Sequence, residues 1–90
     1  MSETSRTVLI ANKRGLHARA SAKLVTLAST QPVPLIVEKS GSRVTATSIM
    51  GLMMLGAAMG DTITISAEGD GAESAVQALV DLVEDRFGED

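Results

Sequence analysis

Apolar residues recur at two different spacings along this 90-residue chain, and the order of those spacings restricts its fold more than any other feature. Alternation of apolar and polar residues is typical of half-buried strands, whereas spacings of three and four are typical of amphipathic helices. Strands are expected at residues 5–11, 34–39, 43–46 and 62–67. Helices are expected at 18–29, at 48–55 and from Ala72 to about Phe87. The order βαββαβα predicts one α+β domain that spans residues 1–90.

Several of these boundaries have a local chemical cause. The QPVP segment at 31–34 should end the first helix, because a residue before proline avoids the helical conformation. Ser40-Gly41-Ser42 is typical of a hairpin turn between the second and third strands. Asp70 and Glu73 resemble a capping box at the start of the last helix.

The hydrophobic core has to be built from aliphatic and methionine side chains. Hydrophobic residues make up 44% of the chain, but Phe87 is its only aromatic residue. The chain has no cysteine, so neither a disulfide nor thiolate chemistry is expected. It also has no apolar run near the ~20 residues of a membrane span, and its first residues, MSETSRTV, do not resemble a secretory signal. We therefore expect a cytoplasmic protein that does not insert into membranes.

Charge is distributed unevenly along the chain. The net charge is −3, yet no acidic residue lies between Thr4 and Val37. Residues 12–23, NKRGLHARASAK, carry four of the eight lysines and arginines and also the only histidine, His17. An acidic chain with one aromatic residue argues against broad nucleic-acid binding, which needs a basic face and stacking aromatics. The basic segment predicts a local site for an anion.

The position of His17 indicates which anion that site would take. Gly15 and Leu16 join the expected first strand to the first helix, which places His17 at or next to the helix N-cap. Free amides and the helix dipole favour an anion there, while Arg14 and Arg19 would each cost about 0.3–1 kcal/mol without one. Guanidinium groups bind phosphate bidentately, and a neutral imidazole is a nucleophile. The residues therefore favour a phosphoryl group carried on a ring nitrogen.

Plainer interpretations of the same residues stay open. A single histidine in a basic loop is commonly a solvated side chain with no chemistry. A metal site is disfavoured, because one histidine without cysteine or nearby carboxylates supplies too few ligands, and no cofactor is expected. A Ser-His-Asp triad is compatible with the composition, although no nucleophile elbow is present.

The segment GLHARA, residues 15–20, followed by an apolar helix, resembles the Gly-x-His-x-Arg-Pro signature of the HPr phosphocarriers. The resemblance continues through residues 46–69 and covers nearly the whole chain in order. The Met-Met-Leu run, the His-Ala-Arg sequence and the acidic end FGED are more similar to the nitrogen-type (NPr) branch than to the sugar-type branch. The resemblance implies an open-faced β-sandwich, with a four-stranded antiparallel sheet and three helices on one face.

It also implies a role in the phosphoenolpyruvate-dependent phosphotransferase system. His17 would take phosphate at Nδ1 from phosphorylated enzyme I and pass it to an enzyme IIA protein, and Arg19 would stabilise the phosphate. Such a chain carries a phosphoryl group in a relay and is not by itself a turnover enzyme. One position departs from the signature, because Ala20 replaces a proline that would stiffen the first helical turn.

The second helix carries two further expectations. Ser48 aligns with a serine that an HPr serine kinase/phosphorylase modifies in some bacteria, although serine is also a common N-cap. The residues that follow Ser48 leave no polar face on this helix. By analogy with the family, Ile49, Met50 and Met53 would face partners together with Lys23, while Leu52 and Leu55 pack inward. A wholly buried helix is the alternative for these side chains.

Two other classes of function fit the same element order. The order βαββαβ also occurs in ferredoxin-like domains, some of which are small acyl-phosphate hydrolases. In such a hydrolase Arg14 would bind the phosphate and His17 would have no role. A small regulatory binding domain without chemistry is the third class.

Overall fold

The structure is a computed structural model that describes residues 3–89. Its four strands are β1 (Glu3–Leu9), β2 (Ile36–Lys39), β3 (Ser42–Thr45) and β4 (Thr62–Glu68). Its helices are α1 (Ala18–Ala28), α2 (Ile49–Met54) and α3 (Ala72–Glu84), followed by the 3₁₀ turn η1 (Arg86–Gly88). All seven expected strands and helices are present, and their order is confirmed.

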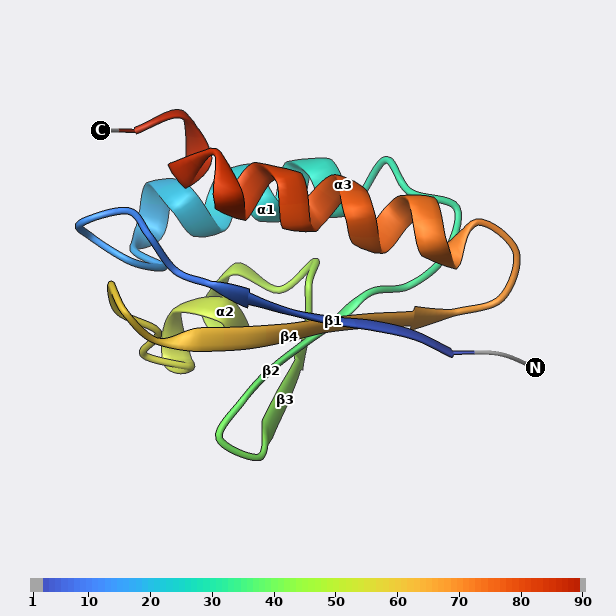
Figure 1. The fold of residues 1–90 in the computed structure, drawn as a ribbon, viewed down its shortest axis with the longest axis horizontal. Helices are drawn as coiled ribbons and strands as arrows, with labels where there is room; N and C mark the ends of the chain where they lie inside the picture. The colour runs from blue at the N-terminus through green and yellow to red at the C-terminus, as the bar shows by residue number, and fades with distance from the viewer. Residues whose placement is uncertain (1–2, 90) are drawn as a thin grey trace.

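The four strands form one antiparallel sheet in the order β1-β4-β2-β3. β1 pairs with β4 from Glu3–Glu68 to Leu9–Thr62, so the first and last strands of the chain lie side by side. Every second side chain of β4 points to the same face, and Ile63, Ile65 and Ala67 are buried there. Figure 1 shows α1 and α3 packed across one face of the sheet, with the other face left open. The open-faced β-sandwich is therefore confirmed.

Aliphatic side chains from all layers fill the space between the sheet and the helices, as the composition predicts. Phe87 is the one ring among them and is 0% exposed. The fully buried residues of this core include Ile10, Leu24, Val37, Leu52, Ile63, Ile65, Val76, Leu79 and Val83. Since Phe87 follows α3, its burial pulls the last described residues of the chain back over the protein.

Two expectations about the last helix are wrong. The N-cap of α3 is Gly71, with φ +88°, and no side chain caps the helix, so Asp70 and Glu73 do not form a capping box. Because Gly71 itself takes the N-cap position, Asp70 lies one residue before the place that a capping side chain occupies. Phe87 does not continue α3 either, because Asp85 ends the helix and Phe87 lies beyond it in η1 with φ +55°.

The loop that precedes α1 is held against the loop that follows α2. The amide of Leu16 donates to the carbonyl of Ala57 (2.9 Å), and the amide of Ile10 donates to the carbonyl of Asp61 (2.8 Å). At Gly15 φ is +65°, and a Cβ built there would lie 2.3 Å from the Ala57 oxygen. Glycine is thus required at position 15 both for its conformation and for the close approach of two backbones.

Gly15→Ala should destabilise the protein much more than Gly56→Ala. Both glycines are left-handed, at φ +65° and +64°, but nothing lies within 4 Å of a Cβ at Gly56. Gly56→Ala should therefore cost only the left-handed penalty of about 1–2 kcal/mol. Gly15→Ala should add roughly 1–3 kcal/mol of overpacking, measured as free energy of unfolding in urea. An equal loss of unfolding free energy in the two variants would show that the loop before α1 can move away from the loop after α2 at no cost.

Candidate functional site

His17 is the N-cap of α1. Its backbone is extended (φ −73°, ψ −179°), and its Nδ1 accepts a hydrogen bond from the backbone N–H of Arg19 at 3.3 Å. A backbone N–H can only donate, so Nδ1 carries a lone pair and no proton. The expectation that His17 lies at the helix start, with first-turn amides facing its ring, is confirmed.

The other ring nitrogen contacts a carboxylate from the end of the chain. His17 Nε2 lies 2.7 Å from Glu89 Oε2, and the two side chains are 21% and 16% exposed. An ionised carboxylate only accepts hydrogen bonds, so Nε2 carries the proton and donates it. The two contacts together fix the imidazole as the Nε2–H tautomer, whose unprotonated nitrogen is Nδ1.

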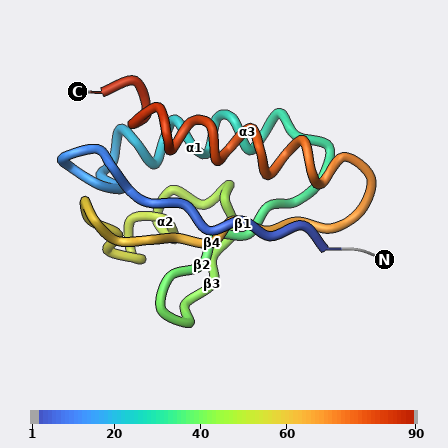
Figure 2. The backbone as a smooth tube through the Cα atoms, in the orientation of Figure 1, coloured from blue at the N-terminus to red at the C-terminus, as the bar shows by residue number. Residues whose placement is uncertain are grey.

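Glu89 is held at this position by neighbours from three parts of the fold. Asn12, which is fully buried, donates from Nδ2 to Glu89 Oε1 (3.2 Å) and to the carbonyl of Gly15 (2.9 Å). Lys23 Nζ donates to the carbonyl of Phe87 at 2.6 Å, which ties the C-terminal segment to α1. Figures 1 and 2 show the segment that follows α3 lying above the start of α1.

The surroundings of Glu89 favour its charged form. Desolvation raises the pKa of this carboxyl, but hydrogen bonds from His17 and Asn12 and the charges of His17 and Lys23 outweigh desolvation and lower the pKa below 4.5. Because folding lowers the pKa of Glu89, its ionised carboxylate stabilises the folded protein at pH values above the pKa of an unfolded glutamate. This stabilisation is lost as the pH falls through the lowered pKa of the folded protein. The contact with His17 therefore has an ionised carboxylate at neutral pH.

Two cations close to His17 in the sequence have no acidic partner among residues 3–89. Arg19 is the second residue of α1 and Arg14 lies in the preceding loop, and both are exposed. The first turn of a helix also has amides without intrahelical partners. Because Ala20 is in this turn and is not proline, its N–H adds a donor that the family signature lacks. The basic residues and the amides of this helix start together favour an anion at this end of α1.

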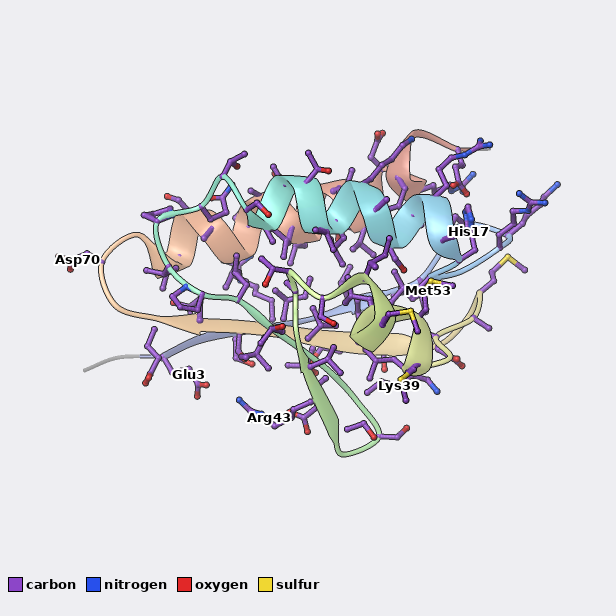
Figure 3. All side chains as sticks on the ribbon, turned by 180° about the vertical axis from the view of Figure 1, so that it is seen from behind. Glu3, His17, Lys39, Arg43, Met53 and Asp70 are labelled. Carbon is purple, nitrogen blue, oxygen red and sulfur yellow. The ribbon has the colours of Figure 1, made fainter. Side chains whose placement is uncertain are left out.

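Ser48 and the methionines of α2 lie at the same end of the molecule. Ser48 is the N-cap of α2, and its Oγ accepts a hydrogen bond from the Gly51 amide at 3.0 Å, so its capping role is confirmed. Figure 3 shows Met53 close to His17, on the neighbouring helix. The side chains on the outer side of α2, here called the methionine patch, are Ile49, Met50, Met53 and Met54.

The exposure of α2 rules out a wholly buried helix. Met54 is 80% exposed, Met50 65%, Met53 42% and Ile49 38%, while Leu52 and Leu55 are buried as expected. Met54, the most exposed of the six, was not singled out from the sequence, because it belongs to an uninterrupted apolar run, Leu52 to Leu55, that does not show which side faces the core. Exposed methionines are typical of adaptable binding surfaces.

The structure brings some of the expected residues together and adds others. His17, Arg19 and Lys23 are on one helix, and Lys23 has a structural contact with Phe87 that sequence did not indicate. Glu89 and Asn12 were missed as parts of the site. The only signal for Glu89 was the acidic end FGED, and nothing in the spacing placed it 72 residues away beside His17.

Two further properties concern only the part of the chain that the structure describes. No three histidine, cysteine, aspartate or glutamate side chains gather as ligands for a metal ion within it. None of its helices combines the length and the apolar character needed to span a bilayer.

Comparison with known proteins supports this interpretation of the site. The family model described as "PTS HPr component phosphorylation site" matches residues 4–85. The phosphocarrier protein HPr of Cupriavidus necator is 46% identical over 84 residues, which cover 93% of this chain and 94% of that protein. The phosphocarrier protein NPr of Shewanella violacea is 40% identical over 89 residues, covering 99% and 98%. Relatives of both names match, so assignment to the NPr branch stays a prediction.

Solved structures agree with the sequence comparison. The crystal structure of HPr-C-His from Thermoanaerobacter tengcongensis superposes with a TM-score of 0.89 at 49% identity, covering 100% of this chain and 99% of that one. The strand order also differs from that of a ferredoxin-like domain, in which the first strand lies between the third and the fourth, whereas β1 here is an edge strand that pairs with β4 alone. Fold, site and relatives lead to one conclusion: the chain belongs to the HPr family of phosphocarrier proteins of the phosphotransferase system.

Proposed function

We propose that this phosphocarrier accepts a phosphoryl group from phosphorylated enzyme I on Nδ1 of His17 and passes it to an enzyme IIA protein. The observation that supports it most is that Nδ1 of His17 carries no proton and lies at the N-terminus of α1, where Arg19 is the second helical residue. Enzyme I and enzyme IIA are the partners that the family resemblance implies.

The proposed transfer is a substitution at phosphorus, in which one bond forms as another breaks. The Nδ1 lone pair forms a bond to phosphorus, while the bond from phosphorus to the donor's leaving atom breaks and its electron pair goes to that atom. The proton on Nε2 does not move, so the ring gains a positive charge and becomes a good leaving group. Transfer to the acceptor reverses these changes and regenerates the neutral Nε2–H ring.

His17→Ala should abolish this activity and leave the fold intact. The side chain is the only imidazole of the chain, and its backbone can still start α1. The measurement is mass spectrometry after incubation with phosphoenolpyruvate and enzyme I, looking for one acid-labile phosphate. Full labelling of the variant would contradict the proposal, and turnover of an acyl phosphate without enzyme I would favour a hydrolase.

Arg19→Ala should slow phosphoryl transfer by about tenfold or more, because a hydrogen bond to a charged group contributes about 1.5–3 kcal/mol. Stability should change by no more than about 0.5 kcal/mol, since the exposed side chain has no acidic partner among residues 3–89. Arg43→Ala is the matched control, because it removes an equal charge from an exposed arginine on β3, far from His17 (Figure 3). Rapid-quench kinetics would separate them, and an unchanged rate for Arg19→Ala would exclude its role.

The methionine patch and Lys23 are the surface on which we expect enzyme I and enzyme IIA to dock. Met50→Asp should weaken enzyme I binding by about tenfold or more, because it places a carboxylate in an apolar contact. Leu9→Asp is the control, since Leu9 is 53% exposed and lies on the open face of the sheet. Calorimetric titration would measure both affinities, and equal affinities would exclude the patch as the docking surface.

Phosphorylation of Ser48 by an HPr serine kinase/phosphorylase is a further proposal. Ser48 is half-buried and its hydroxyl faces the start of α2, where a phosphate would be tolerated by the helix. The added negative charge would lie at the edge of the methionine patch and oppose docking. Mass spectrometry of the protein isolated from its own cells would test this, and absence of phosphoserine under all growth conditions would leave Ser48 as a cap alone.

A further inference from the structure

All four methionines that the structure describes lie on the surface of the protein, and three of them line one side of α2. Met50, Met53 and Met54 are spaced at i, i+3 and i+4, so their side chains are neighbours on the helix. Met59, in the loop that follows α2, is 57% exposed. Methionine is among the residues that are most often buried in proteins. Its confinement to the surface here therefore calls for a chemical explanation.

The hydrophobic core does not depend on these thioethers. Among residues 3–89, neither the buried core nor the half-buried hydrophobic side chains packed against it include a methionine. The inward side of α2 is formed by Leu52, and Leu55 is buried at the end of the same helix. A chemical change at methionine sulfur would therefore alter the surface of the protein and leave its packing intact.

Oxidation is the reaction that an exposed thioether offers. The chain contains no cysteine, so no thiol of its own competes for the oxidant. A hydroperoxide gives one oxygen atom to the sulfur: an S–O bond forms while the O–O bond breaks, the sulfur loses two electrons, and the other oxygen leaves as water or an alcohol. The product is a polar sulfoxide. Methionine sulfoxide reductases reverse the change, with two thiols oxidised to a disulfide and the oxygen released as water.

We propose that the methionines of the methionine patch are a site of reversible oxidation, and that sulfoxide there prevents docking while His17 stays reactive. The inference rests on the proposed function in that enzyme I docks on this patch. An apolar contact buries the thioethers, whereas a sulfoxide oxygen needs a hydrogen-bond donor that such a contact does not supply. The ring of His17 keeps its contacts, because the Arg19 amide and the Glu89 carboxylate are not oxidised by hydroperoxides.

The test uses the full chain, treated with hydrogen peroxide that catalase then removes. Peptide mapping by mass spectrometry follows the oxidation of each methionine over time, and the melting temperature reports the fold. Calorimetric titration measures the affinity for enzyme I. Phosphorylation by potassium phosphoramidate, a small donor that needs no docking, reports the reactivity of His17.

Within the patch, Met54 should be oxidised first and Met53 last, in the order of their exposure. With the patch oxidised, affinity for enzyme I should fall about tenfold or more, the effect of a polar group left without a partner. The melting temperature should change by no more than about 4 °C, as for other surface changes in a domain of this size. Phosphoramidate reactivity should equal that of the untreated protein. Methionine sulfoxide reductases that act on both epimers should restore the affinity.

Leucine variants locate the effect. The triple variant Met50→Leu, Met53→Leu and Met54→Leu keeps an apolar surface without oxidisable sulfur, so its affinity should survive peroxide. Met59→Leu removes the described methionine outside the patch and is the matched control, which should lose affinity on oxidation as wild type does. Met50→Gln places a polar amide of similar length in the patch, so it should weaken binding without any peroxide, whether or not the triple variant docks well.

Three results would overturn the proposal. These are unchanged affinity of the oxidised protein, protection by Met59→Leu in place of the triple variant, and loss of the fold or of phosphoramidate reactivity in parallel with oxidation. Failure of the proposed function looks different, because the untreated protein would then be neither bound nor labelled by enzyme I. In that case the effect on docking is rejected, and oxidation that follows exposure and spares the fold would keep the patch as a modification site.

Discussion

The close approach of two loops sets the position of every group in the site. Gly15 and Leu16 lie against Ala57, and the hydrogen bond from Leu16 to the Ala57 carbonyl fixes the chain immediately before the N-cap of α1. His17 can therefore have an extended backbone and a helical successor at one defined place. The same contact joins the start of α1 to the loop after α2, so His17 and Met53 of the methionine patch lie at the same end of the molecule (Figure 3).

The position of the basic residues near the start of α1 explains why this segment of the chain is positively charged. Cations near a helix start are unfavourable, and the chain places Arg19 there without an acidic partner among residues 3–89. A phosphoryl group on Nδ1 would reverse the sign of that interaction, so the cations favour the phosphorylated state over the free state. Lys23 differs, because its amine is bound to the Phe87 carbonyl and serves to hold the C-terminal segment. Arg19 and Lys23 look equivalent in the sequence, but Arg19 is available to an anion whereas Lys23 holds the C-terminal segment.

Sequence predicted the parts of this protein that depend on local patterns. Alternation and helical spacing located all the strands and helices, and serine before an apolar run located the cap at Ser48. It failed where a left-handed residue redirects the chain, at Gly71 and again at Phe87, because apolar spacing carries no information about the sign of φ. Glu89 was missed for the related reason that its contact depends on such a turn and on Asn12 at the other end of the chain.

The two ring nitrogens of His17 explain why an acidic residue is compatible with a site for an anion. A carboxylate beside Nδ1 would repel phosphate, whereas at Nε2 the ring separates the two negative groups and its own positive charge lies between them. In the free protein the carboxylate accepts the Nε2 proton in a hydrogen bond, which leaves Nδ1 as the unprotonated nitrogen at the start of α1.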